Sequence, residues 1–164
     1  MEQETDERRL DLIETSTSAD RPPSHDAFSL SVAFDDSGDF VLVRNSDDDR
    51  GWEIPGGKVE DGETYADAAA REFEEETGYE LVDPDPFAVI EETYDVEGED
   101  HVIEGRAFVG EIGDEVRETD DEVDAVDVFG SLPDDDELTH ITFTYSTFET
   151  LVSLGREARE RKNH

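Results

Sequence analysis

Apolar and polar residues alternate along several short stretches of the chain, and turn-forming residues separate these stretches. The segment AFSLSVAF (27–34) alternates, DDSGD (35–39) supplies turn residues, and FVLVRN (40–45) resumes the apolar run. Alternation with a period of two indicates a strand with one buried face, and two such runs around a polar turn predict a β-hairpin. A folded domain is therefore predicted over residues 25–164.

Three more β-rich stretches follow in the second half of the chain. The runs PFAVIEETYDV (86–96) and HVIEGRAFVGEI (101–112) flank EGED and predict a second hairpin. The shorter run VDAVDVFG (123–130) precedes the turn-like SLPDDDEL.

Two segments show helical periodicity instead. Thr64 followed by Asp67 is typical of a helix start, and Gly78 is typical of a helix end, so a helix is predicted over about 65–77. Its core-facing residues are predicted to be Ala66, Ala69, Ala70, Phe73 and Thr77. A second helix is predicted over about 142–161, with a core side formed by Phe148, Leu151, Val152 and either Leu154 or Ala158.

Residues 1–24 are polar, contain Pro22 and Pro23 and show no sustained period. They are predicted to form a flexible or loosely packed extension, in which Leu10 to Thr15 could add an edge strand. Strands and helices in this arrangement predict a single-domain α/β fold.

The formal net charge of −36 comes from 49 acidic residues against 13 Lys and Arg, and only Lys58 and Lys162 are lysines. The acidic residues are spread along the whole chain, and concentrated salt would screen their mutual repulsion. We therefore expect a cytoplasmic protein from a halophile. The chain has no basic stripe that would bind nucleic acid. The sequence also lacks a leader-like start and a run of 18 apolar residues, so no membrane association is expected.

A cysteine-free chain has no disulfides, no thiolate metal sites and no cysteine nucleophile. Carboxylates are then the main candidates for chemistry. On the first predicted helix, Glu72, Glu75 and Glu76 fall within an arc of about 100°, close enough to share a hard cation. Glu74 points away from this arc and serves as an internal comparison.

In so acidic a chain, a run such as EFEEE is usually solvated surface, so charge alone decides nothing. The spacing is more informative, because it links Gly57 and Glu63 to Arg71, to the three arc glutamates and to Gly78. From the frequencies of these residues in this chain, such a pattern would arise by accident with a probability of roughly 3 in 100,000.

Within the segment GGKVEDGETYADAAAREFEEETGY (56–79), residues 57–79 resemble the Nudix box, the signature of the Nudix hydrolases, at every polar and glycine position. The match covers 23 of the 164 residues, and Trp52, Pro55 and Gly56 resemble the usual lead-in. Phe73 and Tyr79 depart from the family pattern, which has aliphatic residues there. The resemblance implies an α/β/α sandwich around a mixed β-sheet.

The resemblance also implies a chemistry, the metal-dependent cleavage of a diphosphate linkage. Glu72, Glu75, Glu76 and the Gly57 carbonyl would hold Mg²⁺ or Mn²⁺, and these cations neutralise phosphate oxygens and lower the pKa of a bound water. Arg71 would pair with Glu63 and orient the metal-binding residues.

The base that deprotonates water stays open between Glu72 and a glutamate of a later loop, such as Glu118 or Glu122. Substrate recognition is equally open. Candidate residues for stacking a base or meeting phosphates are Trp52, Tyr94, Phe129, Arg44, Arg50, Lys58 and Arg106, each with an alternative role in the core or on the surface.

The leading substrate class is a nucleoside triphosphate, in its ordinary or oxidised form. The alternative is a Nudix-fold domain that senses a nucleotide without cleaving it, although every carboxylate of the box is present. The expected partner is a small-molecule nucleotide, and a homodimer is possible.

Overall fold

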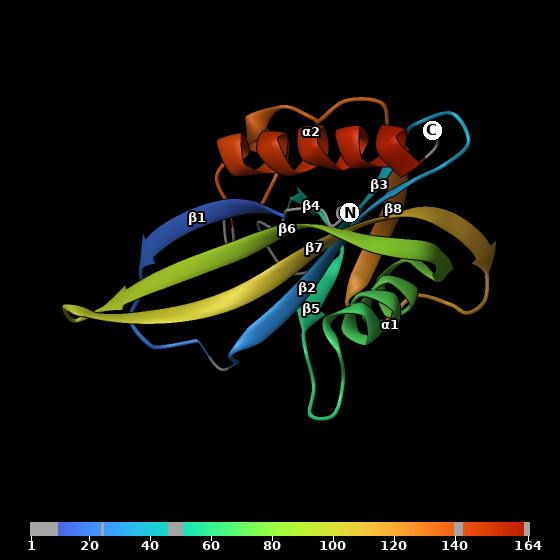
Figure 1. Cartoon of the computed structure of the whole chain (residues 1–164). Coiled ribbons are helices and arrows are strands. Elements are labelled where there is room, and N and C mark those ends of the chain that lie inside the picture. Colours follow the sequence, from blue (N-terminus) through green and yellow to red (C-terminus); the bar gives the residue numbers. More distant parts are fainter. Residues whose placement is uncertain (1–9, 24, 46–50, 140–142, 163–164) are drawn as a thin grey trace, which may run out of the picture.

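The computed structural model describes residues 10–23, 25–45, 51–139 and 143–162. Within these ranges the elements in chain order are β1 (Asp11–Ser18), β2 (Ala27–Phe34), β3 (Phe40–Asn45), β4 (Trp52–Glu53), β5 (Gly56–Lys58), α1 (Tyr65–Thr77), β6 (Tyr79–Val96), β7 (Glu99–Glu115), β8 (Val123–Phe129), a short 3₁₀ helix (Asp135–Glu137) and α2 (Tyr145–Lys162). The described strands form one mixed sheet, and the two α-helices lie on opposite sides of it (Figure 1). The predicted α/β/α sandwich is present.

The strand order is β1-β6-β7-β2-β3-β4, with β5 paired to β2 and β8 paired to β3. β1–β6 and β2–β7 are parallel pairs, and the other pairs are antiparallel. The second predicted hairpin is β6–β7, and it turns at Glu97 and Gly98, both with positive φ. Both strands are longer than predicted, since bulges near Val82 and Pro86 let β6 start at Tyr79.

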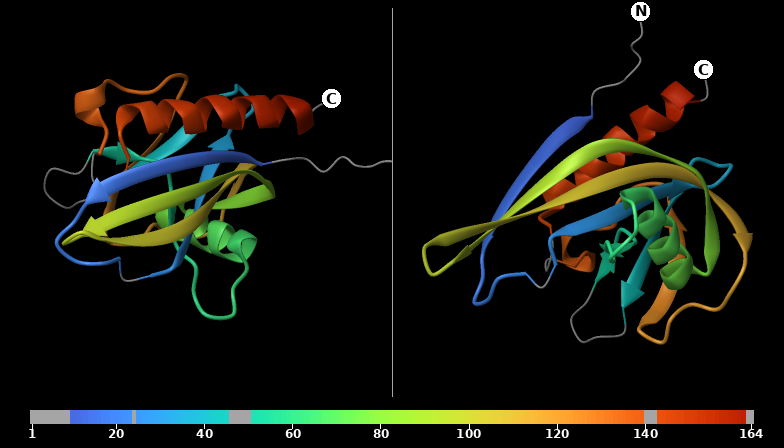
Figure 2. Two further views of the ribbon diagram at one scale, coloured as in Figure 1. Left: turned by 60° about the vertical axis from the view of Figure 1, so that its left-hand side comes forward. Right: turned by 60° about the horizontal axis from the view of Figure 1, so that its bottom comes forward.

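Part of the predicted N-terminal extension is ordered structure. Residues 11–18 form β1, which pairs in parallel with β6 at the edge of the sheet, as the edge-strand alternative predicts (Figure 2). Ile13 anchors the strand because its side chain is buried against the core, whereas Leu12 on the opposite face is exposed. Residues 1–9 lie outside the described part of the chain.

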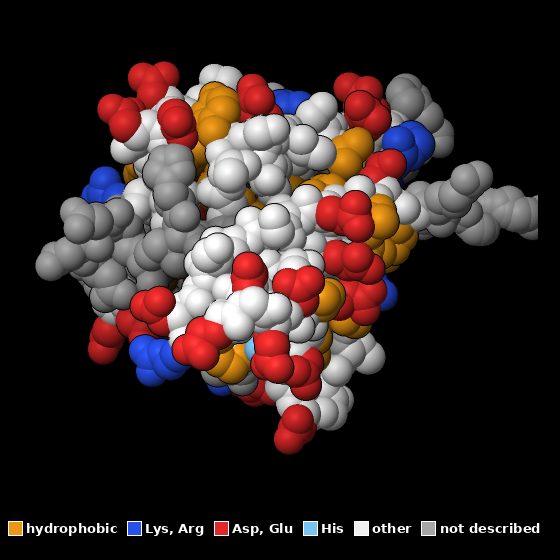
Figure 3. All heavy atoms as spheres, turned by 90° about the vertical axis from the view of Figure 1, so that its left-hand side faces the viewer, with side chains coloured by type: hydrophobic (Ala, Val, Ile, Leu, Met, Phe, Trp, Pro, Cys, Tyr) orange, Lys and Arg blue, Asp and Glu red, His pale blue; other side chains and the backbone are white. Residues whose placement is uncertain are grey.

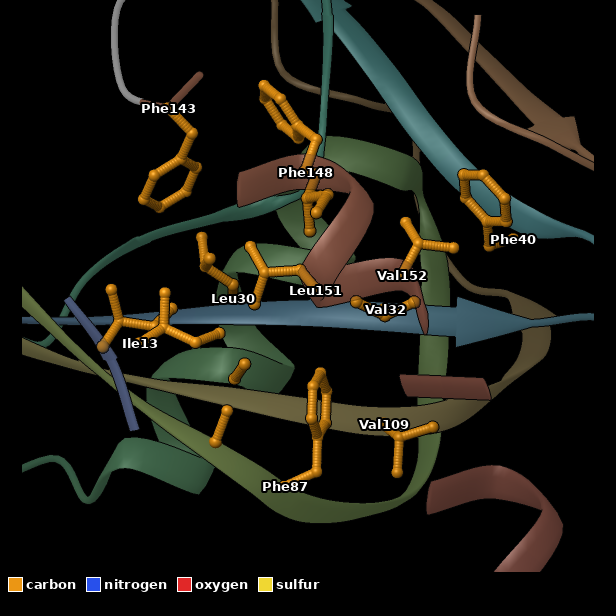
Figure 4. Packing of buried hydrophobic residues seen from close by; sticks show 14 of the residues in the cluster. Ile13, Leu30, Val32, Phe40, Phe87, Val109, Phe143, Phe148, Leu151 and Val152 are labelled. Atoms are coloured by element: carbon orange, nitrogen blue, oxygen red, sulfur yellow. The ribbon is translucent and has the colours of Figure 1, made fainter. Parts of the chain in front are cut away.

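Each face of the sheet has its own apolar core. The larger core lies under α2, where Phe148 and Leu151 pack against Leu30 and Val32 of β2 (Figure 4). The smaller core lies under α1 and contains Ala69 and Phe73. Strand β2 lies between the two cores and is buried along both faces, because successive side chains of a strand point to opposite faces.

Helix α2 is described from Tyr145, so the predicted start at Thr142 lies outside the described residues. The predicted core side is confirmed, and Ala158 is buried while Leu154 packs at its margin. Arg156 and Arg159 near its end donate hydrogen bonds to backbone carbonyls of the loops at Gly38, Gly130 and Asp35. No helix in these ranges is long and apolar enough to cross a membrane.

Candidate active site

Helix α1 begins and ends where local chemistry predicts. The Thr64 hydroxyl accepts a hydrogen bond from the Asp67 N–H at 3.0 Å, and the Asp67 carboxylate accepts one from the Thr64 N–H at 3.1 Å. At the other end Gly78 adopts φ 83° and donates its N–H to the Glu74 carbonyl at 2.8 Å. A left-handed residue at this position favours glycine. The predicted bounds are confirmed.

The buried face of α1 is rotated from the predicted one. Ala66 is exposed and Ala70 is half-buried, whereas Ala68, Ala69, Phe73 and Thr77 are buried. The prediction for Ala66 was wrong because the helix does not pack on the central strands of the sheet alone. Strand β5 also packs on α1, on the side that carries Glu72 and Glu76. Two glutamates are thereby drawn against backbone.

Gly56 and Gly57 of β5 provide the backbone that contacts these two glutamates. The Gly56 N–H donates to Glu76 Oε1 at 2.9 Å. A Cβ added at Gly57 would lie 2.4 Å from the Glu72 carboxyl carbon, so no side chain fits between them. The β5 backbone therefore contacts two of the three arc carboxylates, and at Gly57 the absence of a side chain makes room for the Glu72 carboxylate.

Burial changes the acidity of these carboxylates. Burial and the negative charges of Glu72, Glu53 and Asp120 together raise the pKa of Glu76 to about 8, against the opposing hydrogen bond from Gly56. Burial also raises the pKa of Glu72, although Arg71 opposes the shift. The carboxylates of Glu72 and Glu76 therefore lie where water stabilises their negative charge poorly.

Arg71 connects the helix to the preceding loop. Its Nε and Nη2 donate to the two carboxylate oxygens of Glu63 at 2.7 and 3.0 Å, and Nη2 also donates to the Lys58 carbonyl at 3.0 Å. Nη1 lies 3.0 Å from Glu72 Oε2 and 3.3 Å from Glu75 Oε1. The hydrogen bonds from Arg71 lower the pKa of Glu63 to about 2. The predicted contact between Arg71 and Glu63 is present.

The donor atoms at this end of α1 fit a hard divalent cation. Carboxylate and carbonyl oxygens are the ligands that Mg²⁺ and Mn²⁺ prefer, and buried carboxylates with raised pKa values would be stabilised by such a charge. Across the described ranges, no group of three acidic or histidine side chains is arranged to hold a metal ion as it stands. Glu72 and Glu75 are instead turned toward Arg71, and rotation of their side chains would free them.

The loop at 117–122 contributes an acid that the sequence analysis did not single out. The Asp120 N–H donates to the Glu75 carbonyl at 2.9 Å, and the Asp120 charge acts on Glu76. Glu118 and Glu122, the predicted alternatives, lie in the same loop. Glu53 likewise acts on Glu76 from β4. Neither Asp120 nor Glu53 has a sequence signal, because only tertiary structure brings them to α1.

The predicted substrate-binding residues fall into separate groups. The guanidinium of Arg44 lies 5.2 Å from the centre of the Trp52 ring, and Trp52 packs edge-on against Phe129 at 5.0 Å, so these three contact one another. Arg106 stacks on Tyr65 at 4.5 Å. Lys58 and Tyr94, by contrast, line a common cavity beside Gly57. Arg50 lies outside the described residues.

The fold and this carboxylate-bearing helix define a class of protein: an α/β/α domain whose loop–helix–loop segment gathers acids against two glycines. Comparison with known proteins gives the family. Residues 23–144 match the NUDIX domain, so the chain belongs to the Nudix family.

Similar proteins agree with this assignment. The chain is 40% identical over 55 residues to the uncharacterized Nudix hydrolase YvcI of Bacillus subtilis strain 168, a match that covers 33% of this chain and 34% of that protein. The pyrophosphohydrolase BsRppH of Bacillus subtilis, in its E68A mutant form, superposes with a TM-score of 0.66 at 23% identity, over 83% of this chain and 84% of the other. A MutT NUDIX hydrolase from Burkholderia pseudomallei gives a TM-score of 0.60 at 24% identity, over 80% and 98%.

Proposed function

We propose that this protein is a Nudix hydrolase that uses Mg²⁺ or Mn²⁺ to cleave a diphosphate linkage, with a nucleoside triphosphate, in its ordinary or oxidised form, as the leading substrate class. The observation that carries the proposal is the burial of Glu72 and Glu76 against the Gly56–Gly57 backbone. The family assignment supports it, and so does the similar fold of a pyrophosphohydrolase from Bacillus subtilis.

Each residue of the site has a proposed role. Glu72, Glu75, Glu76 and the Gly57 carbonyl would hold the cation, which supplies charge neutralisation at the phosphate oxygens and acidifies the attacking water. Arg71, held by Glu63 and the Lys58 carbonyl, ties the loop before the helix to α1 and so fixes the orientation of the metal-binding helix. Glu72 is the proposed base, and burial raises the pKa of its carboxyl, which makes the carboxylate a stronger proton acceptor. Glu118, Glu122 and the nearby Asp120 are alternatives from the 117–122 loop.

Incubation of the protein with Mg²⁺ and a panel of nucleoside triphosphates, including oxidised ones, and other nucleoside diphosphate derivatives tests the proposal. We expect cleavage of at least one substrate into two phosphorylated products, and no cleavage in the presence of a chelator. Binding without turnover of any member would instead support the alternative, a nucleotide-sensing domain.

The distribution of charge supports a further proposal, that the protein works in the cytoplasm of a halophile. Acidic side chains are scattered over the face seen in Figure 3, with few Lys or Arg between them. Their mutual repulsion, and their repulsion of an anionic substrate, should be screened when the Debye length falls to about 3 Å at 1 M salt.

We therefore expect the melting temperature to rise by many degrees, and kcat/KM to rise severalfold, between dilute buffer and molar KCl. Thermal denaturation and initial-rate assays across a KCl series measure this, with constant free Mg²⁺. Full activity and unchanged stability in dilute buffer would contradict the halophilic assignment.

A further inference from the structure

A cavity of about 200 Å³ lies directly beside the proposed metal site. Gly56 and Gly57 form part of its wall, and their other contacts are the carboxylates of Glu76 and Glu72. A substrate that reaches the metal site with its phosphates could therefore place its remaining group in this cavity. The cavity is below the 300–1,000 Å³ typical of drug-sized ligands, which fits one flat ring system.

The walls of the cavity suit an aromatic ring. Phe28, Tyr94, Phe143 and Phe148 line it together with aliphatic side chains, and Phe143 and Phe148 meet edge to face at 5.7 Å (Figure 4). Lys58 and His25 lie on the same wall as Gly57. Lys58, on the strand that carries Gly57, would add positive charge where a substrate's phosphates enter.

Two acids line this space, Glu53 of β4 and Glu92 of β6, and of the two only Glu92 is buried. Glu92 of β6 lines the cavity and is 5% exposed, and among the described residues it is the only charged residue in the fully buried set. The Tyr94 hydroxyl donates to its Oε1 at 3.1 Å. A carboxylate offers about four acceptor positions, so Glu92 keeps capacity for donors that a ligand brings. Burying a carboxyl group is costly unless such donors meet it.

We infer that this cavity holds the base of a nucleotide substrate and that Glu92 selects guanine-type bases, whose adjacent ring and amino N–H groups match the two carboxylate oxygens. The inference rests on the proposed hydrolase function, which places the phosphates of the substrate at the metal site. Adenine and cytosine set an acceptor next to their amino group, and that acceptor would face a carboxylate oxygen. Donors from guanine would stabilise the ionised carboxylate, as Tyr94 already does.

Binding of GMP, AMP and CMP, measured by calorimetry without divalent metal, tests the base preference separately from hydrolysis. We expect GMP to bind about tenfold to about a hundredfold more tightly than AMP or CMP, the usual discrimination of a two-bond contact to a base. The kcat/KM for GTP against ATP with Mg²⁺ should show the same preference.

Replacing Glu92 with glutamine changes the pattern that the base meets. The amide of Glu92→Gln offers one donor and one acceptor, so the variant should lose about tenfold or more in GMP affinity and gain affinity for AMP. Glu91→Gln is the matched control, because the neighbouring side chain points to the other face of β6. Circular dichroism melts verify that both variants fold.

The outcomes separate this inference from the proposed function. Turnover of triphosphates without guanine preference, or with a preference that Glu92→Gln leaves unchanged, overturns the inference and leaves the hydrolase intact. Guanine preference that reverses in Glu92→Gln, without turnover of any substrate, supports the cavity and overturns the hydrolase. If Glu92→Gln does not fold, the inference is tested by the base preference of the wild type together with the Tyr94→Phe variant. This variant should bind GMP severalfold more weakly, and an absent preference or unchanged GMP binding overturns the inference.

Discussion

Replacing Glu76 with glutamine should abolish most turnover, by about a hundredfold or more, because the variant loses a charged oxygen ligand while keeping the shape of the side chain. Glu76 lies on the arc of α1 that faces β5, and it accepts the Gly56 N–H. Steady-state kcat and the Mg²⁺ concentration for half-maximal rate measure the effect.

Glu74→Gln is the matched control two residues away. Glu74 is on the same helix but about 160° from Glu76, on the solvated side, so its replacement should leave kcat within about twofold. Equal losses in the two variants would contradict the proposed metal-binding arc.

Although Glu76→Gln should lower activity, it should raise the stability of the metal-free protein. The pKa of Glu76 is about 8 in the folded protein against 4.5 for the ordinary side chain. Between these values the unfolded chain has released the proton that the folded protein retains, so wild-type stability falls as the pH rises from about 4.5 to about 8.

Glutamine does not titrate. The metal-free Glu76→Gln variant should therefore gain stability over the wild type across this window, by on the order of a few kcal/mol at pH 8. Urea denaturation of both proteins in chelator at pH 5 and pH 8 measures it. A difference that does not grow with pH would show that burial of Glu76 costs nothing.

The sequence predicted the features that depend on local chemistry. The Thr64 cap and Gly78 fix both ends of α1 through hydrogen bonds within a few residues, and alternation locates the strands that pack on one face. The contact between Arg71 and Glu63 was also predictable, since the family spacing encodes it.

Features that depend on long-range packing were not predictable in the same way. The exposure of Ala66 and the burial of Ala68 follow from the position of β5, which helical periodicity does not contain. Asp120 and Glu53 reach Glu76 from other elements, and in a chain with 49 acids their identity carries no signal. The site roles themselves stay predictions until turnover is measured.

Gly57→Ala should reduce kcat/KM by about a hundredfold while leaving the fold intact. The added Cβ would lie 2.4 Å from both Cδ and Oε2 of Glu72, closer than real atoms approach, so the carboxylate must move away from β5 and from the proposed metal position. The atoms that must shift belong to the far end of a flexible side chain, and the φ of Gly57 is not in the left-handed region, so the backbone tolerates alanine.

Substitutions at two other glycines, one adjacent and one remote from the site, make this result interpretable. At Gly56 the added Cβ would meet the Ser29 carbonyl oxygen at 2.4 Å, so Gly56→Ala should lower the melting temperature as well as the activity. At Gly130 the nearest atom is an Asp39 carboxylate oxygen at 3.3 Å, and Gly130→Ala should change neither property appreciably. Thermal melts and initial rates of the three variants separate the effects. If Gly57→Ala retained full activity, the position of the Glu72 carboxylate against β5 would not matter for catalysis, because the substitution leaves no room for it there.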